Sequence, residues 1–202
     1  FFNQGQVCCA GSRVFVQKKQ FDNVVADMVS HAEKIKQGSG IHADTEIGPL
    51  VSTEQQNRVL GFIEKGVNEG AELLVGGTKP YEQGYFVSPT IFANVNDEMT
   101  IAKEEIFGPV ISAMPYDDVD DLIARANNSE YGLAAGVWTR DVAKAHYIRE
   151  NLPAATVWVN CFNVFDVASP FGGYKQSGIG REMGSYALNN YTEVKSVWIS
   201  KK

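Results

Sequence analysis

Residues 12–38 read SRVFVQKKQFDNVVADMVSHAEKIKQG, and this stretch decides the fold class. It begins with a short apolar run, Val14-Phe15-Val16, which is typical of a buried strand. Apolar residues then recur at helical spacing from Phe21 to Ile35, and Gly38 stands where a helix commonly ends. The stretch therefore predicts a strand followed by an amphipathic helix.

The alternation of strands and helices continues along the chain. Ser52 and Gln55 have the spacing of a capping box, and Thr139 or Asp141 is suited to cap a later helix. Further strands are predicted at 73–75, 85–87, 109–114, 134–138, 156–159 and 194–200, the last as an edge or exchanged strand, and further helices at 52–70, 117–127, 139–149 and 184–190. Such alternation favours an α/β fold with parallel strand pairs.

Composition excludes several function classes. The 202 residues carry 24 acidic and 18 basic side chains, and the net charge of -6 argues against a nucleic-acid partner, which needs a basic face. No apolar stretch reaches the roughly 18 residues of a membrane span. The first residues lack the basic and apolar regions of a signal peptide, so we expect no secretion and no membrane partner.

The cysteines and histidines narrow the chemistry further. Cys8, Cys9 and Cys161 form no disulfide framework, because their number is odd and two of them are adjacent. We therefore expect a reducing compartment, the cytoplasm, with the mitochondrial matrix as the alternative. The three histidines are scattered without metal-ligand spacing, so we predict no metal site.

Cys8 is the strongest candidate for a reactive residue. It lies between Gly5 and Gly11, next to the small residue Ala10 and just before the predicted strand. A thiol nucleophile needs close backbone approach and N–H donors for the oxyanion that it creates, and small residues leave that space. A buried structural cysteine is the alternative that the residues alone leave open.

Three motifs resemble the aldehyde dehydrogenase family and occur in the family's order. Residues 1–13, FFNQGQVCCAGSR, are similar to its catalytic cysteine segment, and residues 103–110, KEEIFGPV, resemble its cofactor-contact motif. Residues 169–178, SPFGGYKQSG, followed by GRE at 180–182, resemble its C-terminal motif. Intervening stretches match too, so the resemblance covers essentially the whole chain, and the similarity is greatest to NAD-dependent members acting on aliphatic, aromatic or retinal-type aldehydes.

The resemblance implies a domain organisation. Residues 1–190 would form the catalytic domain, a mostly parallel sheet flanked by helices, and residues 191–202 a C-terminal strand for oligomerisation. In the family, the dinucleotide-binding domain, the general-base glutamate and the asparagine of the oxyanion hole precede the cysteine segment. We therefore expect them to be absent from this chain, which alone should be inactive. We also expect a homo-oligomer, either a dimer or a tetramer.

The resemblance assigns Cys8 as the nucleophile. Its thiolate would attack the aldehyde carbon to form a thiohemiacetal, hydride transfer to NAD or NADP would leave a thioester, and water would release the carboxylic acid. A thiolate is nucleophilic near neutral pH, and a thioester hydrolyses readily, so the chemistry suits this residue. The backbone N–H of Cys8 would form one side of the oxyanion hole.

The resemblance also implies binding residues. Glu105 matches the glutamate that holds the nicotinamide ribose, because a carboxylate can accept bonds from two neighbouring hydroxyls. Phe107 matches the aromatic residue near the nicotinamide ring, and Gln55 and Arg58 fall where the family makes further cofactor contacts. The residues assigned to the aldehyde substrate are Phe162, Phe165, Phe171, Val7 and Cys9, of which Cys9 is expected to be non-catalytic.

Three other functions remain compatible with the residues. A cofactor-independent thiol esterase would use Cys8 with a base such as His146, although His146 carries no motif. A non-catalytic structural or interaction domain would need neither Cys8 nor Glu105. A relative that acylates CoA would replace water with CoA as the acyl acceptor.

Overall fold

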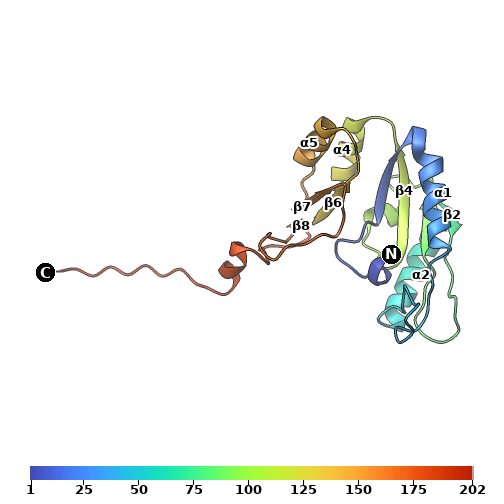
Figure 1. Cartoon of the computed structure of the whole chain (residues 1–202), viewed down its shortest axis with the longest axis horizontal. Helices are drawn as coiled ribbons and strands as arrows, with labels where there is room; N and C mark the ends of the chain where they lie inside the picture. Colours follow the sequence, from blue (N-terminus) through green and yellow to red (C-terminus); the bar gives the residue numbers. More distant parts are fainter. Residues whose placement is uncertain (202) are drawn as a thin grey trace. The chain divides into compact units, whose positions relative to one another are not determined.

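The computed structural model describes residues 1–201, which divide into two compact units (Figure 1). The first unit spans Phe1–Asn128, and the second begins at Ser129. These two units are defined by their compactness and do not by themselves identify functional domains. The assignment of residues 1–190 to a catalytic domain and of residues 191–202 to an oligomerisation strand stays a prediction.

A four-stranded sheet forms the centre of the first unit. The strand order is β1-β4-β3-β2, with β4 parallel to both β1 and β3, and β2 antiparallel to β3. The predicted α/β class with a mostly parallel sheet is therefore confirmed. The bounds of the strands are Arg13–Gln17 for β1, Glu72–Val75 for β2, Thr90–Ala93 for β3 and Val110–Tyr116 for β4.

Side chains that alternate along the strands build a separate core on each face of this sheet. Phe92 of β3 packs in one cluster with residues of α2 (Thr53–Asn68), including Val59. The next residue, Ala93, packs in the other cluster with residues of α1 (Phe21–Ala32), including Phe21. Because successive strand residues point to opposite faces, helices on both faces keep the parallel strands buried.

Polar side chains cap two helices of the first unit. Ser52 accepts a hydrogen bond of 3.2 Å from the backbone N–H of Gln55, which confirms the cap predicted for α2. Asp118 caps α4 by accepting from the N–H groups of Asp120 and Asp121. The bounds of the remaining helices of this unit are Thr100–Lys103 for α3 and Val119–Asn127 for α4, with a short 3-10 turn, η2, at Lys18–Gln20.

The second unit repeats the strand–helix pattern on a smaller scale. β6 pairs in parallel with β7, and β5 pairs antiparallel with β8. Asp141, one of the two predicted capping residues, accepts from the N–H of Lys144 and caps α5. The bounds are Tyr131–Gly132 for β5, Ala134–Val137 for β6, Val142–Asn151 for α5, Thr156–Val159 for β7, Tyr174–Lys175 for β8 and Ser185–Asn190 for the 3-10 helix η3.

One sequence-based expectation needs correction. The strand predicted at 85–87 is wrong: Phe86 and Val87 are buried but belong to a loop, and the strand follows Pro89 as β3. All four residues of β3 are buried, so no alternation marked it in the sequence. The helix predicted at 184–190 is present as the 3-10 helix η3, Ser185–Asn190.

The C-terminal segment carries no assigned strand over residues 191–201. Its apolar side chains are exposed, and Trp198 is 92% accessible. A strand needs a partner for its backbone N–H and C=O groups, and an exchanged strand finds that partner only in a second chain. The exchanged strand therefore stays a prediction.

Within residues 1–201, none of the helices combines the length and apolar character needed to span a bilayer.

Candidate active site

The chain enters the cysteine segment through a left-handed turn. Asn3, Gln4 and Gly5 have φ values of 48°, 57° and 70°, a region that side chains larger than glycine rarely adopt. The Asn3 side chain donates to the carbonyl of Gln6 at 3.1 Å, and the Gln6 N–H donates back to the Asn3 carbonyl at 3.0 Å. Strained backbone of this kind persists only where the surrounding structure holds it, and it is common at functional sites.

The two adjacent thiols have opposite environments. Cys8 is exposed, whereas Cys9 is buried, with 6% of its surface accessible. Burial, and secondly the charge of Cys8, raises the pKa of the Cys9 thiol, so Cys9 stays protonated and weakly nucleophilic near neutral pH. Cys8 is thus the thiol of this pair that a substrate can reach.

The cysteine segment packs closely against the loop that carries Glu105 and Phe107. Gly5 is buried, and a Cβ added to it would lie 2.0 Å from the carbonyl oxygen of Gly108. Gly108 is equally confined, because a Cβ there would lie 2.5 Å from a methyl carbon of Val59 on α2. Two glycines therefore let the two loops approach each other and the helix behind them.

Substitution of Gly5 by alanine is expected to lower the free energy of unfolding by roughly 2–4 kcal/mol, from left-handed strain together with overlap against Gly108. Urea-induced unfolding measures the change. Gly61 on α2 provides the control, because a Cβ there would meet open space and alanine favours a helix. Gly61→Ala should raise the free energy of unfolding by about 0.5–1 kcal/mol. Equal effects of the two substitutions would contradict the close approach at Gly5.

Phe107 also has a left-handed backbone, with φ of 55°. Two side chains of α2 hold the loop in which it lies. Gln55 Nε2 donates to the carbonyl oxygens of Phe107 at 2.7 Å and Ile106 at 3.3 Å, and Arg58 Nη2 donates to the carbonyl oxygen of Glu105 at 2.9 Å. Gln55 and Arg58, predicted from sequence to contact the cofactor, thus also bind three successive carbonyls of this loop.

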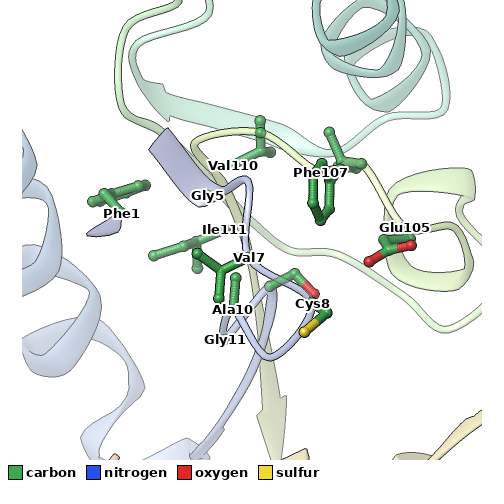
Figure 2. A pocket seen from close by; sticks show the side chains of 13 residues that line it. Phe1, Gly5, Val7, Cys8, Ala10, Gly11, Glu105, Phe107, Val110 and Ile111 are labelled. Atoms are coloured by element: carbon green, nitrogen blue, oxygen red, sulfur yellow. The ribbon is translucent and has the colours of Figure 1, made fainter. Parts of the chain in front are cut away.

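Cys8, Glu105 and Phe107 line one pocket in the first unit. Figure 2 shows the Cys8 sulfur, the Phe107 ring and the Glu105 carboxylate around a common opening. Val7 lines the same pocket, but Cys9 does not. Glu105 is exposed and 38% of Phe107 is accessible, so both can meet a ligand. The remaining lining residues are Phe1, Gly5, Ala10, Gly11, Ser12, Ile106, Gly108, Val110 and Ile111.

Arg13 anchors the exit of the cysteine segment, and sequence reasoning did not identify it. Its Nη2 donates to the carbonyl of Ala126 at the end of α4, and its guanidinium lies 5.7 Å from the centre of the Phe15 ring. Burial, opposed by the charge of Asp97, lowers the pKa of Arg13 from its usual value. The sequence does not indicate this anchoring role of Arg13, because its hydrogen-bond partner Ala126 lies 113 positions away.

The three aromatic residues predicted to bind substrate lie in the second unit. Phe165 packs against Trp158 at 5.5 Å and Phe171 at 5.2 Å between ring centres, both edge to face, and Phe162 packs on Trp158 at 4.9 Å. The Trp158 indole N–H donates to the carbonyl of Val164 at 2.8 Å. These contacts form one aromatic cluster, and its substrate role stays a prediction.

The other sequence candidates have local contacts. His146 accepts from the guanidinium of Arg149, one turn along α5, so its ring nitrogen is engaged within its own helix. No group of three or more metal-binding side chains occurs in the described part of the chain.

The fold and this pocket define an α/β protein that presents an accessible thiol next to an exposed carboxylate. The family model described as "Aldehyde dehydrogenase family" matches residues 1–197. The chain belongs to the aldehyde dehydrogenase family.

Individual relatives agree with this result. DhaS of Bacillus subtilis (strain 168), which is named as an aldehyde dehydrogenase, is 70% identical over 98% of this chain. The mitochondrial aldehyde dehydrogenase of Homo sapiens is 52% identical over 98% of this chain. The NAD+ complex of an aldehyde dehydrogenase from Bacillus cereus matches 98% of this chain with 57% identity and a TM-score of 0.96. The chain spans 40% of DhaS, 38% of the human protein and 40% of the Bacillus cereus chain.

Proposed function

We propose that this chain is the nucleophile-bearing part of an enzyme that oxidises an aldehyde to a carboxylic acid with NAD or NADP. The observation that carries the proposal is the shared pocket: the exposed thiol of Cys8 and the exposed carboxylate of Glu105 line it together with the Phe107 ring. A non-catalytic structural domain would not need an exposed thiol and an exposed carboxylate in one pocket. A thiol esterase would have no need for Glu105.

Cys8 would carry the covalent chemistry. Its thiolate forms a C–S bond with the aldehyde carbon, and the carbonyl electron pair moves to the oxygen, which gives a thiohemiacetal whose oxyanion the Cys8 N–H stabilises. A bound nicotinamide cofactor would supply the acceptor for the hydride that leaves this carbon. The resulting thioester on Cys8 is hydrolysed by water, which breaks the C–S bond and releases the carboxylic acid and the thiol.

The residues of the pocket suit a nicotinamide nucleotide. The Glu105 carboxylate is exposed, so its two oxygens can accept hydrogen bonds from the neighbouring hydroxyls of a ribose. The accessible face of Phe107 offers an aromatic surface to a planar ring. Val7 would supply a substrate contact in this pocket, and the family resemblance also assigns Phe162, Phe165 and Phe171 to the substrate.

Other parts of a longer protein would complete the enzyme. Because the chain spans about 40% of its relatives, we propose that the remaining cofactor contacts, the general base and the second oxyanion donor lie outside it. A cytoplasmic homo-oligomer, in which residues 191–202 pair with a second chain, is the assembly that the family resemblance favours.

A chimera tests the function directly. In it, these 202 residues replace the matching segment of the Bacillus cereus enzyme, whose NAD+ complex has a closely similar fold. With an aldehyde and NAD, the chimera should form NADH, measured by its near-ultraviolet absorbance. The isolated 202-residue chain should form none, because hydride transfer requires the nicotinamide to be held against the reacting carbon. A folded chimera without activity would contradict the proposed function.

A further inference from the structure

We propose that Gln55 and Arg58 are positioning residues that set the geometry of the Glu105–Phe107 loop, an inference that rests on the proposed function. Both side chains donate to backbone carbonyls of that loop, as described above. The three carbonyls are consecutive, so α2 holds the whole turn and leaves its side chains to face the pocket.

The two amide protons of Gln55 face the loop. Nε2 lies within hydrogen-bond distance of the carbonyl oxygens of both Ile106 and Phe107, which leaves Oε1 as the polar atom of this side chain that could meet a ligand. A direct contact with the cofactor would therefore use the Gln55 side chain only as an acceptor. Support of the loop uses the same side chain only as a donor. A substitution that removes only the donors therefore separates the two roles.

The backbone of Phe107 explains why the loop needs this support. A non-glycine residue at φ of 55° occupies a costly conformation, and an aromatic side chain gains nothing from it locally. The bond of 2.7 Å from Gln55 to the carbonyl of Phe107 acts on the strained residue itself. Loss of this bond should let the backbone relax and turn the ring away from its place in the pocket.

Arg58 is itself held in place before it supports the loop. Its guanidinium lies 4.9 Å from the centre of the Phe62 ring, one turn further along α2. Phe62 is buried in the core of the first unit, so it provides a fixed platform. Arg58 thereby reaches the carbonyl of Glu105, whose side chain we propose to hold the cofactor ribose.

Gln55→Glu in the chimera tests the inference, because this substitution keeps the shape and the acceptor and removes both donors. The kcat for aldehyde oxidation should fall by about tenfold or more, with the aldehyde KM little changed, since a displaced Phe107 misplaces the nicotinamide. A deuterated aldehyde should then show a larger isotope effect on kcat, because hydride transfer has become slower. A role in folding alone would not move this isotope effect.

Matched controls separate positioning from charge and from folding. Asn57 is an exposed amide on the same helix, and Asn57→Asp adds the same charge without touching the loop, so it should retain wild-type kinetics. Alkylation of Cys8 by iodoacetamide should proceed at the wild-type rate in Gln55→Glu, because it needs no cofactor. Gln55→Met, which removes the donors without adding charge, should reproduce the loss of kcat.

The outcomes are distinguishable. If the unsubstituted chimera forms no NADH, the proposed function fails. If it is active and Gln55→Glu matches Asn57→Asp, Gln55 acts as an acceptor or not at all, and the inference is overturned. If both Gln55 variants fail to fold, Arg58→Met decides the question, because Arg58 is exposed and its loss spares the core. The same fall in kcat and the same isotope effect in Arg58→Met support positioning. Wild-type kinetics of Arg58→Met overturn the inference.

Discussion

Cys8→Ala in the chimera is expected to lower kcat/KM for aldehyde oxidation by at least about 10³-fold, because removal of a covalent nucleophile eliminates the route through a thioester. Cys9→Ala provides the matched control. Cys9 is buried and does not line the pocket, so its substitution should change kcat/KM by only a few fold. NADH formation at saturating NAD measures both variants.

A chemical readout accompanies the kinetics. Iodoacetamide should modify Cys8 faster than Cys9, since Cys8 is exposed and burial raises the pKa of Cys9. Peptide mass spectrometry identifies the alkylated residue. Full aldehyde oxidation by Cys8→Ala, or preferential alkylation of Cys9, would refute the nucleophile assignment.

Glu105→Ala is expected to raise the KM for NAD by about 100-fold, which corresponds to about 3 kcal/mol. Hydrogen bonds to a charged group contribute about 1.5–3 kcal/mol each, and the carboxylate would accept from two ribose hydroxyls. The change should be expressed in cofactor binding, with Cys8 alkylation unaltered. Initial rates at varied NAD concentration provide the measurement.

Glu104 is the control for this effect. It precedes Glu105 directly, it is exposed, and it does not line the pocket. Glu104→Ala removes the same charge from the same loop, so it reports any general electrostatic contribution. If the two alanine variants raise the KM for NAD equally, Glu105 has no specific contact with the cofactor.

Most of the secondary structure could be predicted from sequence, and the exceptions have physical reasons. Ser52 and Asp141 were recognisable as caps because capping is local, and α1 was recognisable because its apolar residues repeat every three to four positions. Strand β3 escaped prediction, since all its residues are buried and it has no alternating pattern. Phe86 and Val87 were wrongly predicted to form a strand, because a buried loop residue is apolar in the same way as a buried strand residue.

The candidate site shows the same division. Cys8, Glu105 and Phe107 could be proposed from two motifs about 100 positions apart, but no sequence pattern states that they share a pocket. The contact between the motifs depends on Gly5 meeting Gly108, a close approach that exists only once β1 and β4 pair in parallel.

The sequence by itself determined the α/β class and the family, and it proposed Cys8 as the nucleophile, because these inferences depend on local periodicity and on motifs that are contiguous in the chain. Tertiary structure alone decided which thiol is buried, how the two loops meet, and what Gln55 and Arg58 bind. Those properties depend on atoms brought together from distant positions: the hydrogen bond from Gln55 to Phe107 joins residues 52 positions apart, and its geometry exists only after the sheet and α2 have packed.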